Sequence, residues 1–142
     1  MIIPDANVLL YAVNQDAPQH GPARHWLEAT LSGDEAVGWT WLVLLAFLRI
    51  STSQRVFDRP LEVDEALALI DGWLERPVSR LVQPGPHHWP LLRQLLSASG
   101  TAANLSSDAH LAAIALEQGA RLASCDRDFQ RFSGLRAEAP LR

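Results

Sequence analysis

Apolar positions along the chain fall into two patterns that alternate from one end to the other. Short apolar runs are typical of buried strands, whereas apolar residues that recur every three or four positions are typical of helices. Strands are therefore predicted at residues 1–4, 36–39, 79–83, 120–125 and, at one edge, 135–141. Helices are predicted at residues 8–13, 22–33, 41–52, 62–76, 87–100 and 106–119, with a short helical turn at 126–132.

This alternation of strands and helices predicts the fold class. Each crossover helix must cover one face of a sheet, so the pattern indicates a layered α/β fold with a mainly parallel central sheet. The longest apolar run, residues 39–48, is too short to cross a membrane and is followed by Arg49. It is interpreted as part of a buried helix, and no membrane attachment is expected.

Composition narrows the possible classes of protein. A chain of 142 residues suits one domain, residues 1–142, and its one cysteine, Cys125, cannot form an internal disulfide. No basic leader precedes the first strand, so a reducing, cytoplasmic setting is expected. The net charge of −4 argues against holding nucleic acid through bulk positive charge. The basic residues number 12 and none is lysine, which disfavours receiver domains and aspartyl-phosphate phosphatases because both need a lysine.

Acidic residues follow two of the predicted strands. Asp5 comes directly after the strand at residues 1–4, and Asp126 follows the strand at 120–125. In open parallel sheets, ligands bind beyond the carboxyl ends of the strands. Asp108 lies in the first turn of the helix that precedes the second of these strands, from which it can reach the same edge. The three carboxylates are therefore expected to converge on one pocket.

Each carboxylate also has a purely structural interpretation. Asp5 fits a turn or cap at a strand-to-helix junction, with Asn7 as the N-cap of the first helix. Asp108 fits a favourable charge in the first turn of its helix. Asp128 either caps the turn that follows it or joins Asp126 across a strand-to-helix connection. Several carboxylates without a basic partner would repel one another and take up protons unless a divalent cation neutralised them. Mg²⁺ fits such a set, since it prefers oxygen ligands and supports hydrolysis of phosphodiesters.

Four segments together carry a resemblance to a known family: PDANVLLYA, WLVLLAFLRISTS, NLSSDAHLAAIALEQG and SCDRDFQRF. In this order, and over nearly the whole chain, they resemble the PIN domain, and specifically the VapC-type toxins of toxin–antitoxin pairs. The resemblance implies a three-layer α/β/α PIN-like fold and an endoribonuclease that depends on Mg²⁺ or Mn²⁺. It further implies an RNA substrate, a cognate VapB-type antitoxin that silences the enzyme, and a homodimer.

The resemblance also implies which residues form the site. The positions that match the acidic, metal-binding and catalytic residues of the family are Asp5, Asp108, Asp126 and Asp128. Three further positions match supporting polar residues: Asn7, Ser124 and Asn104. Asn104 lies just ahead of the helix at 106–119, where turn formation is an equally good interpretation.

The chain departs from the family pattern at one position. PIN domains typically carry a glutamate in the context E-F-L-R, and here the corresponding residue is Ala46. The missing carboxylate leaves open whether one or two ions bind. It also leaves an alternative function, a catalytically weakened PIN-fold protein that binds RNA or an antitoxin.

The histidines and tryptophans are given structural roles and no part in the site. The five histidines do not have a zinc spacing, and His110 is interpreted as a packed or surface residue. The apolar contexts of four tryptophans predict core or dimer-interface positions and not RNA contacts: Trp39, Trp41, Trp73 and Trp89.

Overall fold

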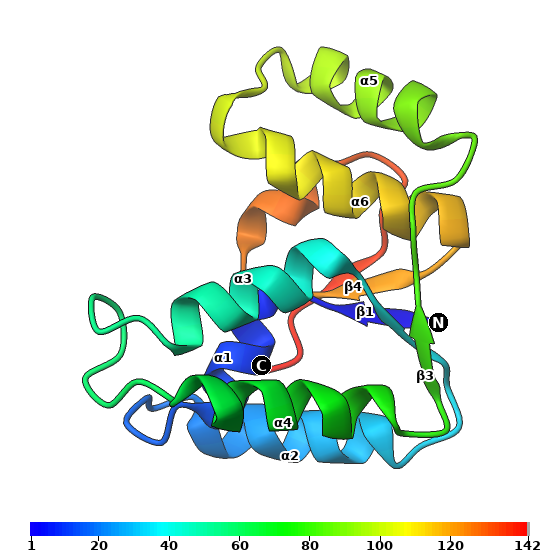
Figure 1. Ribbon diagram of the computed structural model, residues 1–142. Helices are drawn as coiled ribbons and strands as arrows, with labels where there is room; N and C mark the ends of the chain where they lie inside the picture. The colour runs from blue at the N-terminus through cyan, green and yellow to red at the C-terminus, as the bar shows by residue number, and fades with distance from the viewer. Residues whose placement is uncertain (142) are drawn as a thin grey trace.

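A five-stranded parallel sheet forms the centre of the computed structural model, which describes residues 1–141 (Figure 1). The strand order is β3-β2-β1-β4-β5. The strands are β1 (Ile2–Pro4), β2 (Val37–Trp39), β3 (Ser79–Leu81), β4 (Arg121–Ala123) and β5 (Ala137–Glu138). The helices are α1 (Ala6–Val13), α2 (His20–Leu31), α3 (Trp41–Ser51), α4 (Val63–Leu74), α5 (His88–Ser99) and α6 (Ser106–Gln118), with two 3-10 helices, η1 (Ala103–Leu105) and η2 (Arg127–Arg131).

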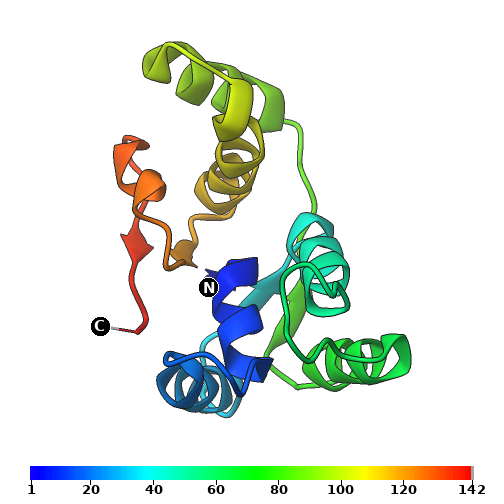
Figure 2. The ribbon, with the colours of Figure 1, turned by 90° about the vertical axis from the view of Figure 1, so that its left-hand side faces the viewer.

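The helices cover the sheet from two sides. Helices α5 and α6 pack together on one side, whereas α2 and α4 lie on the other, and the two views agree on this arrangement (Figures 1 and 2). Each helix connects strands that run in the same direction, as parallel sheets require. The predicted α/β fold with a parallel sheet and α/β/α layers is therefore confirmed.

Strand β1 lies at the centre of the sheet and is buried along its whole length. Its neighbour β2 contains Gly38, where a Cβ atom would come within 2.9 Å of side-chain atoms of both Ile3 and Val82. Such a distance is shorter than real Cβ contacts, so side chains from the chain segments on both sides of β2 close over Gly38, and a larger residue there would force them to shift.

Local signals explain where the helices begin and end. Thr40 caps α3 by accepting a hydrogen bond from the Val43 N–H at 3.2 Å, and helix α4 starts with a capping box between Glu62 and Glu65. Helix α6 ends at Gly119, which has a left-handed backbone with φ of 63°. The helix predicted at residues 41–52 is present as α3, Trp41–Ser51.

Two local predictions need correction. Asn7 is not the N-cap of the first helix, because the cap is Asp5, whose carboxylate accepts a hydrogen bond from the Ala6 N–H. Asn7 instead lies within α1, where its amide is free to bond to residues after β4. The second helix begins at His20, so that Pro22 is its third residue, a position that needs no backbone N–H within the helix.

Three aromatic rings form the packing centre on the α3/α4 side of the sheet. The indoles of Trp39 and Trp73 are stacked with centroids 5.5 Å apart, and the Phe47 ring meets Trp73 edge-on at 4.9 Å. Ser79 accepts a hydrogen bond from Trp39 Nε1 and donates one to the Trp73 carbonyl. The core prediction for Trp39 and Trp73 is confirmed, whereas Trp41 and Trp89 are exposed. No helix within residues 1–141 is long and apolar enough to cross a membrane.

We expect Trp73→Ala to lower the free energy of unfolding by about 3–5 kcal/mol, because it removes a buried ring and leaves a cavity between Trp39 and Phe47. Urea denaturation measures the change. The matched control is Trp89→Ala, whose indole is 65% exposed and whose loss should change stability by less than about 0.5 kcal/mol. Equal effects of the two substitutions would contradict the assignment of this aromatic centre.

Candidate metal centre

The pairing of β1 with β4 brings the two strand ends that carry aspartates side by side. Pro4 is in register with Ala123, and the Asp5 N–H donates to the Ala123 carbonyl at 2.8 Å, one residue beyond the last paired position of β1. Asp5 and Asp126 therefore leave the same edge of the sheet on adjacent strands. This is the carboxyl edge at which the sequence placed the site.

Asp5 is held by a network of donors from both strands. Its carboxylate accepts hydrogen bonds from the Ala6 N–H at 2.7 Å, the Ser124 hydroxyl at 2.7 Å and the Asn7 amide at 3.3 Å. Burial is the largest influence on its pKa and raises it, whereas the Ser124 and Ala6 hydrogen bonds act in the opposite direction and the charge of Asp126 adds to the increase. The carboxylate is thus fixed in orientation by three donors.

Ser124 connects this network to the next aspartate. Besides donating to Asp5, its buried hydroxyl accepts hydrogen bonds from the Asn7 amide at 3.2 Å and from the Asp126 N–H at 3.0 Å. The Asn7 carbonyl oxygen accepts a further bond from the Cys125 N–H at 3.1 Å. The structure therefore brings together two of the three predicted supporting residues, Asn7 and Ser124, beside Asp5.

Three carboxylates form a compact acidic trio: Asp108, Asp126 and Asp128, with one oxygen of each lying within 4.8 Å of the others. Asp126 and Asp128 share this space because the chain turns sharply from β4 into η2. The Asp126 side chain accepts a hydrogen bond from the Asp128 N–H at 2.9 Å and is the cap of η2. The alternative in which Asp128 caps the turn is therefore wrong.

Mutual repulsion makes the trio costly without a cation. The pKa of Asp108 is raised to about 6, first by burial and then by the negative charges of Asp126, Asp5 and Asp128. None of the ion pairs formed within residues 1–141 includes a carboxylate of the trio, so no ion pair in this part of the chain offsets the repulsion. Carboxylate oxygens at this spacing form a donor set that suits a hard divalent cation such as Mg²⁺ or Mn²⁺.

The other predicted positions lie outside the trio. Asp5 is not among the carboxylates within 4.8 Å of one another, although its charge raises the pKa of Asp108. Asn104 is exposed in η1, directly before α6, and among residues 1–141 its side chain has no hydrogen bond to the site, which fits the turn interpretation. Ala46 is half-buried in α3, a helix without an acidic residue.

Two histidines pack together between α5 and α6. The ring nitrogens Nε2 of His88 and Nδ1 of His110 are 2.9 Å apart, with the rings edge-to-face, which joins α5 to α6. Burial and the neighbouring His88 lower the pKa of His110. The interpretation of His110 as a packed residue is confirmed.

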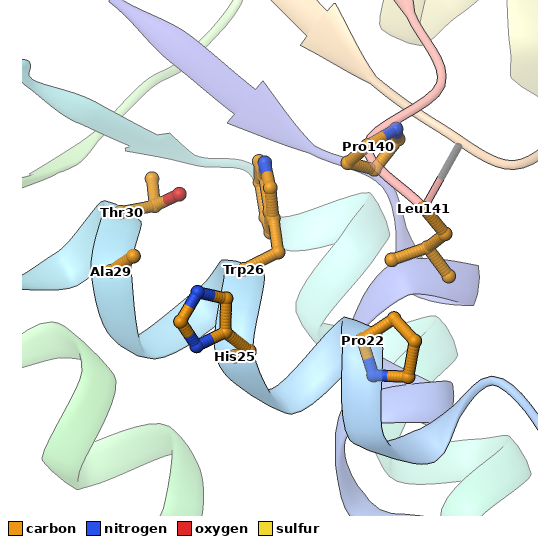
Figure 3. A pocket seen from close by; sticks show the side chains of 7 residues that line it. All are labelled: Pro22, His25, Trp26, Ala29, Thr30, Pro140 and Leu141. Carbon is orange, nitrogen blue, oxygen red and sulfur yellow. The ribbon is translucent and has the colours of Figure 1, made fainter.

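Sequence reasoning assigned no role to two residues that lie beside the trio. Arg127 and Gln130 belong to η2 and line a hollow that also includes Asp126. The available signal was the position of Arg127 between two candidate aspartates. A second hollow, of about 570 Å³, lies between α2 and the C-terminal segment and has no acidic lining residue: Pro22, His25, Trp26, Ala29, Thr30, Pro140 and Leu141 (Figure 3).

Comparison with known proteins identifies the family. The PIN domain profile matches residues 2–135. The chain belongs to the PIN domain family. It is 46% identical over 140 residues to a protein of Mycobacterium tuberculosis named Ribonuclease VapC37, with 99% of this chain and 97% of that protein covered. It is 44% identical over 142 residues to Ribonuclease VapC33 of the same species, with 100% and 99% covered.

Solved structures share the architecture of this PIN domain at low sequence identity. The complex VapBC2 from Rickettsia felis, bound to a promoter DNA fragment, has a chain that superposes with a TM-score of 0.71 at 19% identity and covers 97% of this chain and 98% of that one. VapC20 of Mycobacterium tuberculosis, described as a toxin that cleaves the sarcin-ricin loop, superposes with a TM-score of 0.61 at 20% identity, covering 96% and 99%. These likenesses support the fold.

We expect the stability of the metal-free PIN domain to fall as the pH rises through about 6. With its pKa raised from 3.8 to about 6, Asp108 binds a proton in the folded protein at pH values where the unfolded chain has released it. This stabilising component is fully present below pH 3.8 and is lost as the pH rises through about 6. Asp108→Asn removes the component.

Urea denaturation of the parent and of Asp108→Asn in EDTA, at about pH 5 and about pH 7.5, measures this contribution of Asp108 to the free energy of unfolding. Relative to the parent, Asp108→Asn should be more stable at the higher pH than at the lower one. A difference between variant and parent that does not change with pH would show that Asp108 has an ordinary pKa.

Proposed function

We propose that this protein is an endoribonuclease that depends on Mg²⁺ or Mn²⁺ and acts as the toxin of a toxin–antitoxin pair, with residues 1–142 as one PIN domain. The observation that carries the proposal is the acidic trio, which lies at the carboxyl edge of the sheet and has no ion-pair partner among residues 1–141. The full-length similarity to proteins named ribonuclease VapC supports the same reaction class.

In this proposal, Asp108, Asp126 and Asp128 hold the cation, and Asp5 completes the acidic site from the adjacent strand end. Asn7 and Ser124 orient Asp5 and the start of the Asp126 turn through the hydrogen bonds described above. A bound Mg²⁺ or Mn²⁺ would supply Lewis acidity and neutralise charge at the phosphodiester. The hydrogen bonds of the chain hold Asp5 and the Asp126 turn in place for that cation.

Ala46 defines the alternative. A PIN domain without the family glutamate has one carboxylate fewer for a second ion, and α3 supplies none in its place. A second ion would therefore bind more weakly. If this loss removed catalysis entirely, the protein would only bind RNA or an antitoxin. Cleavage that depends on added metal separates the enzyme from this alternative.

Partner binding is supported by unpartnered apolar side chains on two helices that pack together. Helix α3 exposes Trp41 and Leu45, and the N-terminal half of α4 exposes Val63 and Leu67. Large apolar side chains at a surface favour protein–protein contact. We assign these exposed side chains to a homodimer contact, with a VapB-type antitoxin as the second protein partner, since similar structures include toxin–antitoxin complexes. A cytoplasmic location is part of the same proposal.

We expect RNA cleavage with Mg²⁺ or Mn²⁺, none in EDTA, and a loss of about hundredfold or more in rate for Asp126→Asn, because the substitution removes a charge that neutralises the cation. A single-stranded RNA pool and gel analysis measure the rate. The control is Asp71→Asn, which changes an exposed aspartate on α4 outside the site. Metal-independent cleavage, or full activity in Asp126→Asn, would overturn the assignment. RNA binding without any cleavage would favour the alternative.

We also expect the purified protein to have the mass of a dimer in light scattering and Leu45→Glu to shift it toward the monomer. Leu45 is 60% exposed, so the glutamate is compatible with the folded monomer but places a charge in an apolar contact. Trp89→Glu, at an exposed position on α5, is the control and should leave the mass unchanged. A monomeric parent protein would contradict the dimer.

A further inference from the structure

A hollow with polar walls lies directly beside the acidic trio. It has a volume of about 520 Å³ and lies between the β4–η2 segment and the residues after β5. Its lining residues are Ser124, Cys125, Asp126, Arg127, Gln130 and Ala139. We call it the η2 hollow. Asp126 belongs both to this hollow and to the trio, so a molecule that fills the hollow also reaches the proposed metal centre.

Arg127 provides the hollow with an unneutralised positive charge. Its side chain is exposed and has no ion-pair partner among residues 1–141, in contrast to Arg59 and Arg121, which pair with acidic residues. The charge is therefore available for an anionic ligand.

The other walls of the hollow add hydrogen-bonding groups without negative charge. The Gln130 amide N–H lies 3.5 Å from the Ala137 carbonyl oxygen, a long contact, and within the described chain its amide oxygen has no hydrogen bond. A carboxamide with a free oxygen can recognise a base edge.

We infer that the η2 hollow binds the nucleotide next to the cleaved phosphodiester of single-stranded RNA, with Arg127 holding a backbone phosphate and Gln130 contacting the base. The inference rests on the proposed ribonuclease function. Arginine binds phosphate through two N–H groups in a fixed geometry, and an unpaired base leaves its edge accessible. Arg127 thus places a positive charge directly after Asp126, a proposed metal ligand, in a chain whose net charge is −4.

The test measures RNA binding as a function of salt in an Asp108→Asn background, in which cleavage is silenced. Fluorescence anisotropy with a labelled single-stranded oligonucleotide is recorded between about 50 and 200 mM salt. Loss of one phosphate contact lowers the slope of log affinity against log salt by about 0.7 for single strands. Arg127→Gln should show this smaller slope and about tenfold weaker binding.

Two matched variants separate a phosphate contact from a general effect of charge. Arg131→Gln removes an equally exposed arginine from the same 3-10 helix but outside the η2 hollow, and it should keep nearly the parental slope. Arg127→Lys preserves the charge and should restore most of the slope. In the active protein, Arg127→Gln should raise KM with kcat changed less than about twofold, as expected for a ground-state contact.

Gln130→Ala tests the base contact. It should leave the salt slope unchanged and reduce the difference in kcat/KM between oligonucleotides that differ only at the nucleotide beside the cleavage site. Unchanged discrimination would overturn the role of Gln130.

The outcomes also separate this inference from the function on which it rests. A parent protein that neither cleaves nor binds RNA would overturn the proposed function. A parent that cleaves RNA, together with equal salt slopes for Arg127→Gln and Arg131→Gln, would overturn the η2 hollow alone. If Arg127→Gln weakened only the binding of a protein inhibitor and left RNA binding intact, the hollow would be a protein contact and the inference would be wrong.

Discussion

The site depends on the parallel pairing of β1 with β4. Pro4 and Ala123 are in register, and the Asp5 N–H donates a hydrogen bond to the Ala123 carbonyl. The segments that follow β1 and β4 therefore leave the sheet at the same level. Ser124 then lies close enough to bond to Asp5, although the two residues are 119 positions apart in the sequence. A shift of register by one residue would turn Ser124 to the other face of the sheet and separate the two acidic segments.

The carboxylate of Asp5 and the carboxylates of the acidic trio differ in how their charges are compensated. Asp5 is buried, and three donors compensate for much of the hydration that it loses. Within residues 1–141 no donor bonds to the Asp108 carboxylate, and the negative charges of Asp126, Asp5 and Asp128 raise its pKa further. The protein therefore stabilises one carboxylate internally and leaves a compact group whose repulsion only a proton or a cation can relieve. This division supports the proposal that the trio holds the cation and that Asp5, held in place by its donors, completes the acidic site from the adjacent strand end.

The sequence predicted the layers, the parallel sheet and the edge that carries the acidic residues, because strand and helix patterns are local and strand ends follow from them. It did not predict which aspartate caps η2, since Asp126 and Asp128 both suit a cap and only the turn geometry chooses between them. The cap of α1 was misassigned to Asn7 for the same reason. The hollow beside Arg127 could not be predicted from the sequence, because one of its walls is formed by the segment after β5, which lies close to η2 only in the folded protein.

The net charge of the chain predicts repulsion of RNA, whereas the proposed site requires attraction of RNA. A short-range positive charge at the site would satisfy both. A chain with a net charge of −4 repels RNA at long range, so favourable binding must come from short-range contacts. A cation held by the trio and the guanidinium of Arg127 would place positive charge on both sides of Asp126. RNA would then be attracted only where the metal is bound and the hollow is free. Such an arrangement makes affinity depend on the metal, and it gives a protein inhibitor a small target, since covering the η2 hollow and the trio together would remove nearly all of the local attraction for RNA.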